Sequence, residues 1–125
     1  KGDRGGNLIY IRTSSDTTDL QDFWDERLGT TNDVRKVLQQ GFIYRKKIPY
    51  VADYVAEMNP DLWVKESFKI AKNKVYLNGK LKFVTNARLP IPKVSDGYVE
   101  ESLSVAVERA TIAGYRLAQL ASLSI

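Results

Sequence analysis

The chain has 125 residues, 43% hydrophobic and 27% charged, as in an ordinary folded domain, and no apolar run approaches the roughly 20 residues of a membrane span. Its 19 basic and 15 acidic residues leave a net charge of +4, which suits a polyanionic partner without requiring one. It contains neither Cys nor His, which excludes disulfides, thiolate and imidazole catalysis, and the commonest zinc ligands within these residues.

The first residues form the glycine-rich stretch Gly2-Asp3-Arg4-Gly5-Gly6-Asn7. Consecutive glycines permit positive φ and let backbone amides approach an anion, although a tight turn explains the same pattern without a ligand. The stretch begins partway through a motif, so we expect the chain to be a fragment of a larger protein. The β-branched and aromatic residues from Leu8 to Arg12 predict a short strand after it.

A first helix is predicted with Thr17 or Thr18 as its cap, Asp19 in its first turn and Gly29 at its end. Its apolar side comprises Leu20, Phe23, Trp24 and Leu28. Because Trp24 falls on this side, it is expected in the core rather than on a base-stacking platform, and the same interpretation applies to Trp63.

Two further helices are expected between residues 30 and 59. One is capped by Thr30 or Thr31 and ends at Gly41, with a buried face made of Val34, Val37 and Leu38. The other opens at Pro49 and ends at Asn59-Pro60. Its apolar residues recur at three- and four-residue spacing, as Val51, Tyr54, Val55 and Met58.

The Asn59-Pro60 pair also predicts the cap and first turn of a fourth helix. Its apolar stripe comprises Val64, Phe68, Ala71 and Val75. Beyond it, Asn78-Gly79 lies between two apolar runs, from Lys74 to Leu77 and from Lys80 to Val84. This pattern is typical of a two-residue hairpin turn, and a helix end followed by a loop explains it almost as well.

The prolines of Leu89-Pro90-Ile91-Pro92 predict an extended connector, because each disfavours helix in the residue before it. From Gly97 onward we predict a long last helix. One face of it is formed by Val99, Leu103, Ala106, Ala110, Ala113, Leu117 and Leu120. The chain is therefore expected to be a mainly α single domain spanning residues 1–125, with one short strand and a small hairpin as the open element.

Chemistry-bearing residues are few. Gln21 and Asp25 lie four residues apart on the first predicted helix, so both project from one face, as two ligands of one metal ion should. A carboxylate is a good zinc ligand and a neutral carboxamide is a poor one, so a solvated polar face is the simpler interpretation of the pair. Basic residues suited to phosphate are Arg45, Lys46, Lys47, Lys65, Lys69, Lys72 and Lys74, and an ordinary solvated surface is the simpler interpretation for them.

Three motifs occur in a recognisable order: Gly2-Asp3-Arg4-Gly5-Gly6-Asn7, then Asp19-Leu20-Gln21-Asp22-Phe23-Trp24-Asp25, and finally Ala113-Gly114-Tyr115-Arg116-Leu117-Ala118. Together with Trp63-Val64-Lys65-Glu66-Ser67 they resemble the S1/P1 nuclease family, which is related in fold to bacterial phospholipase C. In that family a Gly-Asp-x-Gly-Gly-Asn stretch is followed by a strand and by Asn-Leu-His-x-x-Trp-Asp, whose His and Asp bind zinc.

The resemblance implies a multi-helical phospholipase C/nuclease-type fold, incomplete here, of which this chain is the C-terminal half. Complete members of the family hold three zinc ions. By position, Asp25 resembles the zinc-binding aspartate, and Gln21 stands where the zinc-binding histidine is expected. Gly5, Gly6 and Asn7 resemble the loop that borders the substrate cleft.

The activity implied by the resemblance is zinc-dependent cleavage of single-stranded nucleic acid or 3′-nucleotides by a metal-activated water. Alone, the chain is expected to be inactive and to associate with its missing N-terminal half or with a second copy. A secreted or periplasmic location is also implied. Two alternatives stay open: a catalytically degenerate homologue kept for binding, which Gln21 suggests, and a relative that acts on phospholipid head groups.

Overall fold

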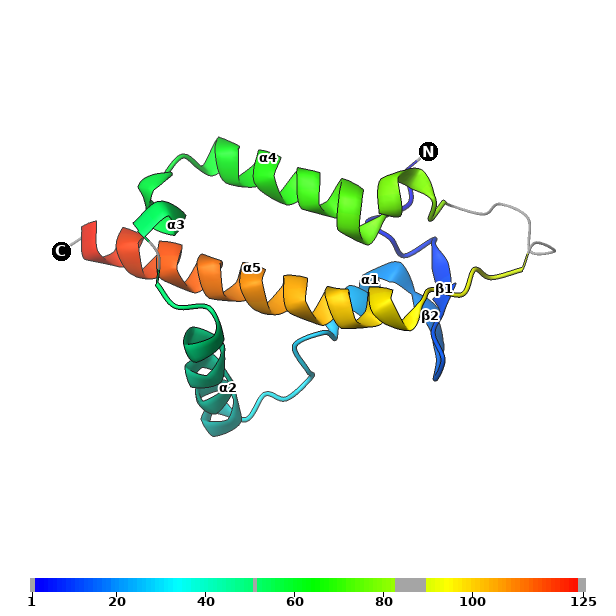
Figure 1. Cartoon of the computed structure of the whole chain (residues 1–125), viewed down its shortest axis with the longest axis horizontal. Coiled ribbons are helices and arrows are strands. Elements are labelled where there is room, and N and C mark those ends of the chain that lie inside the picture. The colour runs from blue at the N-terminus through cyan, green and yellow to red at the C-terminus, as the bar shows by residue number, and fades with distance from the viewer. Residues whose placement is uncertain (1, 51, 83–89, 124–125) are drawn as a thin grey trace.

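The computed structural model describes residues 2–50, 52–82 and 90–123, and it confirms a mainly α architecture (Figure 1). Two short strands and a first short helix come at the beginning of the chain, as β1 (Tyr10–Arg12), β2 (Thr17–Asp19) and α1 (Leu20–Asp25). The helices that follow are α2 (Val34–Lys47), α3 (Ala52–Ala56), α4 (Pro60–Ile70) and α5 (Asp96–Leu123). Within these residues no helix is long and apolar enough to span a bilayer.

The predicted first strand is present as β1. It pairs with β2, which contains Thr17 and Thr18, the residues expected to cap a helix. Strands β1 and β2 pair antiparallel, with Ile11 opposite Thr18. The cap of α1 is therefore Asp19, whose carboxylate accepts a hydrogen bond from the backbone N–H of Asp22 at 3.0 Å. The threonines are β-branched and favour the extended backbone, while aspartate is among the best N-caps.

Helix α2 starts later and runs further than predicted. Asp33 caps it by accepting from the backbone N–H of Arg35 at 2.9 Å, and the helix continues through Gly41 to Lys47. The predicted end at Gly41 is wrong, because this glycine does not adopt the positive φ of a helix end and no proline follows it before Lys47. Its predicted buried face is also wrong, since Val34 is 70% exposed and Leu38 is 60% exposed.

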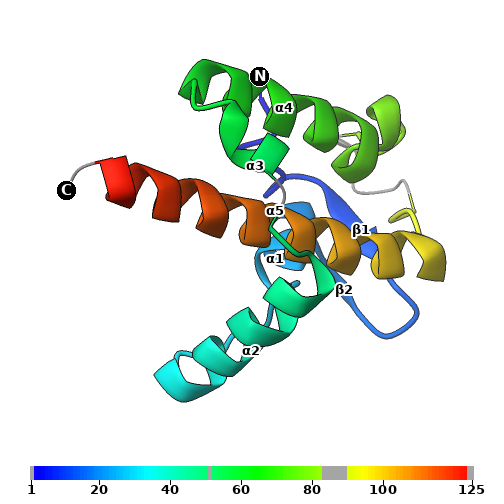
Figure 2. The ribbon, with the colours of Figure 1, turned by 60° about the vertical axis from the view of Figure 1, so that its left-hand side comes forward.

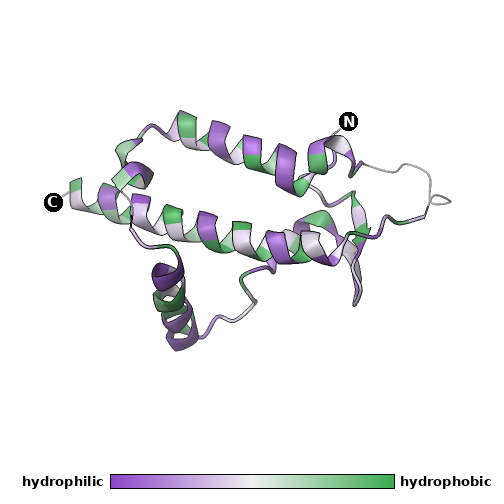
Figure 3. Cartoon of the chain, viewed as in Figure 1, coloured by the Kyte–Doolittle hydropathy of each residue, from purple (hydrophilic) through white to green (hydrophobic). Residues whose placement is uncertain are grey.

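The exposure of α2 follows from its position. The helix touches the rest of the molecule mainly at α5, and it projects from that helix in both orientations shown (Figures 1 and 2). Its half-buried edge includes Gln40 and Tyr44. In Figure 3, coloured by hydropathy, α2 carries alternating polar and apolar bands rather than one continuous apolar side.

The predicted cap of the fourth helix is confirmed. Asn59 accepts a hydrogen bond from the backbone N–H of Asp61 at 2.9 Å, and Pro60 occupies the first turn of α4. The preceding helix, α3, is shorter than the predicted one; Val51 and the side chain of Tyr54 lie outside the described residues.

The described residues from the end of α4 to residue 82 do not form the expected hairpin. Ala71–Val75 makes one π-helical turn and Leu77–Gly79 makes a 3-10 turn, in which Asn78 has a φ of 56°. The second of the two explanations for Asn78-Gly79, a helix end followed by a loop, therefore holds up to residue 82. The remaining residues of the expected hairpin, Phe83 and Val84, lie outside the described part.

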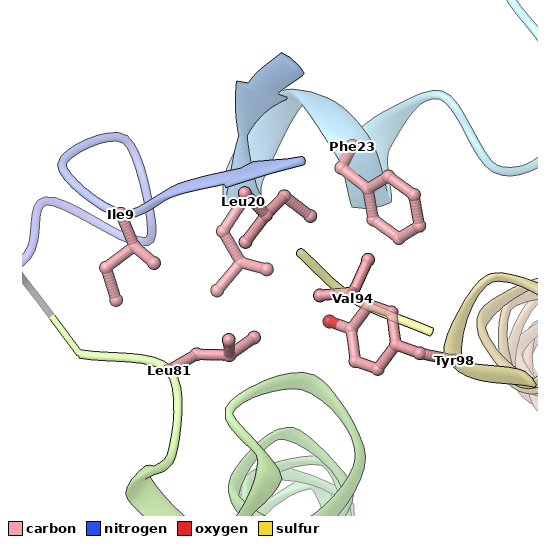
Figure 4. Close-up of a cluster of buried hydrophobic side chains, with 7 residues drawn as sticks. Ile9, Leu20, Phe23, Leu81, Val94 and Tyr98 are labelled. Atoms are coloured by element: carbon pink, nitrogen blue, oxygen red, sulfur yellow. The ribbon is translucent and has the colours of Figure 1, made fainter. Parts of the chain in front are cut away.

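The hydrophobic core lies at one end of the molecule, where the β1–β2 hairpin, α1 and the start of α5 meet. Its buried members are Ile9, Ile11, Leu20, Phe23, Leu81, Val94 and Tyr98. Figure 4 draws these side chains converging, and all except Ile11 are labelled. The connector of residues 90–92 lies along β1, because the backbone N–H of Arg12 donates to Pro92 at 2.9 Å and that of Val94 donates to Arg12 at 2.8 Å.

Tyr98 gives this core a polar centre. Its hydroxyl accepts a hydrogen bond from Trp24 Nε1 at 2.9 Å and donates one to the carbonyl of Val75 at 2.9 Å. Burial raises the pKa of Tyr98 to about 12, so the hydroxyl keeps its proton at neutral pH. Trp24 is half-buried and packs against the core, as predicted.

The buried face of α5 differs from the predicted one. Leu103, Leu117 and Leu120 are exposed, with Leu117 at 67%. The buried positions are instead Tyr98, Ser102, Val107, Thr111, Ile112 and Arg116. Ser102 and Thr111 can be buried there because each hydroxyl donates a hydrogen bond to a backbone carbonyl of the same helix. The distances are 2.6 Å from Ser102 to Val99 and 2.7 Å from Thr111 to Val107.

Charged side chains join α4 to α5. Glu66 of α4 accepts hydrogen bonds from Arg109 and from Arg116, with 3.1 Å between Arg116 Nη2 and Glu66 Oε2. The buried Arg116 guanidinium also lies 5.1 Å from the ring centroid of Trp63. This cluster joins α4 to α5, the longest described helix, through ion pairs and hydrogen bonds.

Replacing Tyr98 by Phe tests the polar centre. Tyr98→Phe leaves Trp24 Nε1 and the Val75 carbonyl without their shared partner, so we expect the free energy of unfolding to fall by about 1–2 kcal/mol. Urea denaturation of the variant measures this. Tyr10→Phe, at a tyrosine that is half exposed, is the matched control and should change little; equal effects of the two changes would contradict the role assigned to Tyr98.

The Glu66 cluster predicts a pH dependence. The hydrogen bond from Arg116 is the main cause that lowers the pKa of Glu66. A lowered folded-state pKa contributes stability above the unfolded-state pKa of about 4.3, and this contribution is lost as the pH falls through the folded-state value. Glu66→Gln should cost about 1 kcal/mol at pH 6 and progressively less below pH 4, as followed by urea denaturation. A cost that stays constant down to pH 2.5 would contradict this.

A loop and helix that bring the candidate residues together

The glycine-rich stretch folds into a tight turn that satisfies its own backbone. Asp3 accepts a hydrogen bond from the Gly5 N–H at its carboxylate, at 3.1 Å, and one from the Leu8 N–H at its carbonyl, at 3.1 Å. Arg4, Gly5 and Gly6 all have positive φ, of 56°, 69° and 95°. Glycine adopts this left-handed backbone without steric cost, which explains two of the three positions.

This loop lies against the beginning of α1. A Cβ atom built on Gly6 would lie 3.2 Å from the backbone nitrogen of Gln21 and 3.3 Å from Leu20 Cβ, which is closer than a side chain ordinarily approaches. Gly6 is therefore required here for two independent reasons, its positive φ and its close contact with the helix. The sequence pattern predicted a close backbone approach at this loop, but the structure shows that the approach is to α1.

Asn7 joins the loop to Gln21. Its side-chain nitrogen donates to the Arg4 carbonyl at 3.0 Å and also donates to Gln21 Oε1. A Cβ on Gly5 would lie 3.8 Å from the same Gln21 oxygen, which is ordinary contact. The structure thus brings together four of the five residues singled out from the sequence.

Asp25, the fifth, lies one turn beyond Gln21 at the end of α1 and is exposed. It belongs to an acidic group on and beside this short helix, formed by Asp19, Asp22, Asp25 and Glu26. The negative charge of Asp19 is the main cause that raises the pKa of Asp22. Negative charge is therefore concentrated along α1, which suits a cation better than a phosphate.

Tyr76 is a neighbour of the loop that the sequence analysis did not identify. Burial raises its pKa to about 12, and its hydrogen bond with the carboxylate of Asp3 adds to the shift. No local spacing links residues 3 and 76, so only the path of the chain after α4 brings them together. Tyr76 thus lies beside Asp3, whose carboxylate closes the glycine-rich turn by accepting from the Gly5 N–H.

These residues do not by themselves form a zinc site. Among the described residues there is no group of three or more Asp, Glu, His or Cys side chains placed to hold a metal ion. The carboxamide oxygen of Gln21, a weak ligand in any case, accepts the hydrogen bond from Asn7. Asp25 is the member of the predicted pair whose side chain is a good zinc ligand.

The basic residues considered as phosphate contacts are dispersed over several elements, as in an ordinary solvated surface. Arg45, Lys46 and Lys47 form the last turn of α2, Lys65 and Lys69 lie on α4, and Lys72 lies in the π turn. Lys74, in the same turn, forms an ion pair with Glu101 of α5. They do not surround the glycine-rich loop as a single patch.

The mainly helical fold, with a glycine-rich turn clamped onto an acidic helix, is consistent with the class of helical nucleases suggested by the motifs. A model of the S1/P1 nuclease family matches residues 1–125. The chain belongs to the S1/P1 nuclease family, which confirms the resemblance. Comparisons with curated proteins and with solved structures found no match.

The Gly6 contact gives a direct test of the loop. Gly6→Ala introduces a Cβ at a φ of 95° and against the backbone of α1, and we expect it to lower the free energy of unfolding by about 1–3 kcal/mol. Gly2→Ala is the matched control, since nothing lies within 4 Å of its added atom. Thermal denaturation of both variants measures the difference, and a neutral Gly6→Ala would show that the loop does not pack on α1.

Proposed function

We propose that the protein is a phosphodiesterase that acts on single-stranded nucleic acid or 3′-nucleotides, and that residues 1–125 form the C-terminal half of its fold. The observation that carries the proposal is the family match over the whole chain, joined to the contact of the glycine-rich loop with α1. That contact sets the loop motif beside the helix that carries Asp25, the arrangement expected of residues that border one cleft.

Within this proposal the residues of the loop have different roles. The side-chain N–H groups of Asn7 and the backbone N–H of Gly5 are turned inward to other loop atoms or to α1, so they maintain the shape of the loop. Arg4 is exposed at the loop's tip and carries a charge suited to a phosphate oxygen. We assign substrate contact to Arg4 and loop geometry to Gly5, Gly6 and Asn7.

Zinc dependence belongs to the same proposal. Asp25 is the residue of this chain that would hold a zinc ion, and the remaining ligands would come from another segment of the protein. A bound zinc ion supplies charge stabilisation and a more acidic water in phosphodiester hydrolysis. The acidic surroundings of Asp25 favour a cation at this end of α1.

A second function is supported by one specific observation. Gln21 Oε1 is engaged by Asn7 where the family pattern has a zinc-binding histidine, which favours a homologue that has lost catalysis and is kept for binding. Such a protein would still use the loop to recognise nucleotides. Action on phospholipid head groups is a third outcome of the experiment below.

We also propose that the chain associates with another segment or with a second copy, in a secreted or periplasmic setting. Large apolar side chains are exposed on α2, α4 and α5, and they include Phe42, Phe68 and Leu117. Such exposed surface ordinarily marks a contact with another polypeptide.

The function is tested by zinc analysis and substrate cleavage on the longest natural form of the protein. We expect bound zinc and release of nucleotides from single-stranded DNA that stops with EDTA. Asp25→Ala should slow cleavage about tenfold or more, since about 1.4 kcal/mol of lost transition-state stabilisation corresponds to a factor of ten. Asp16→Ala, at an exposed acidic residue of the β1–β2 turn, is the control and should leave the rate unchanged.

The alternatives give different results in the same experiment. Neither zinc nor cleavage, with retained binding of single-stranded DNA, would identify the binding-only homologue. Cleavage of phosphatidylcholine in vesicles without cleavage of DNA would identify the phospholipase. Either result would refute the nuclease proposal.

A further inference from the structure

We infer that the Asn7–Gln21 hydrogen bond fastens the glycine-rich loop to α1 in the absence of a metal ion, so that Gln21 acts as a positioning residue rather than as a ligand. The residues present differ from the family pattern at position 21. A histidine and an aspartate four residues apart on a helix can grip one zinc ion, whereas here the first is a neutral amide. The Gln21 amide accepts a hydrogen bond from Asn7 in the loop.

The geometry of Asn7 makes it well suited to this role. Its one side-chain nitrogen has two hydrogens, and the structure gives each an acceptor: the Arg4 carbonyl within the loop and Gln21 Oε1 on α1. The same side chain therefore closes the turn and ties the turn to the helix. An aspartate has the same shape but no hydrogens to donate, so only the amide can make both bonds.

The loop needs such a tie. Three consecutive residues with positive φ, at positions 4 to 6, hold it in a conformation that an unconstrained chain would leave readily. The Gly6 contact brings it against α1 but is a packing contact, whereas the hydrogen bond fixes its orientation. In a relative with a histidine at this position, the ion would draw that side chain toward itself; in this chain no ion is needed to order the loop.

Amide hydrogen exchange on the full chain tests this, with the Leu8 and Ile9 N–H groups as reporters, since both donate to loop carbonyls at 3.1 Å. Gln21→Ala should accelerate their exchange about fivefold, the effect of losing one hydrogen bond of about 1 kcal/mol. Gln21→Glu keeps the acceptor oxygen and should leave the rates within about twofold. EDTA or added zinc should not change the rates of the unsubstituted protein.

The isosteric change Asn7→Asp separates hydrogen bonding from packing. It keeps the shape but places a carboxylate against the Arg4 carbonyl, so loop exchange should accelerate although the volume is unchanged. The Val94 amide, which donates to Arg12 at 2.8 Å away from the loop, is the internal reference and should stay constant. If it also accelerates, the variant has unfolded more widely. The deciding comparison is then made in the unsubstituted protein. Asn7 and Asn32 are both exposed, and the side-chain amide of Asn7 should exchange more slowly because it is hydrogen-bonded to Arg4 and Gln21.

Two results would overturn the inference. Faster loop exchange of the unsubstituted protein in EDTA would show that a metal ion holds the loop. Unchanged exchange in both Gln21→Ala and Asn7→Asp would show that the hydrogen bond does not hold it. Because the readout is the order of the loop and not nucleotide release, a failed nuclease assay leaves this test unaffected.

Discussion

The hydroxyl of Tyr98 connects three parts of the chain at the centre of the hydrophobic core. Through its two hydrogen bonds it fixes Trp24 after the hairpin and the carbonyl of Val75 after α4 at the first turn of α5. Around it the rings of Phe23 and Tyr98 stack with centroids 5.7 Å apart. A buried hydroxyl with both partners satisfied specifies one arrangement, where apolar contacts alone would permit several.

The glycine-rich loop depends on this core. Ile9, which follows the loop, is buried in the core, and its carbonyl accepts a hydrogen bond from the Leu20 N–H at 2.8 Å. These contacts fix the distance between the end of the loop and the start of α1. Given that spacing, Gly6 fits against the helix and the side chain of Asn7 reaches Gln21. The candidate site is therefore a consequence of the core packing behind it, and its polar residues refine a geometry that apolar side chains establish.

The far end of the molecule is organised differently. There α4 and α5 meet through Glu66, Arg109 and Arg116, and many large apolar residues remain exposed. Ion pairs are directional but contribute little net stability at partly exposed positions. This end of the described structure is therefore held mainly by polar contacts. The end that carries the loop has polar contacts and the hydrophobic core together.

Local chemistry was readable from the sequence alone. The mainly α class, the cap at Asn59 with Pro60, the strand that ends at Arg12 and the family motifs all depend on a residue and its near neighbours, which the sequence states directly. Burial was not readable, because it depends on which elements arrive on each side: α5 buries Ser102 and Thr111 while Leu117 stays exposed. The pairing of Asn7 with Gln21, and of Asp3 with Tyr76, likewise required the folded chain, since no spacing rule connects residues that only the hairpin and the turn after α4 bring together.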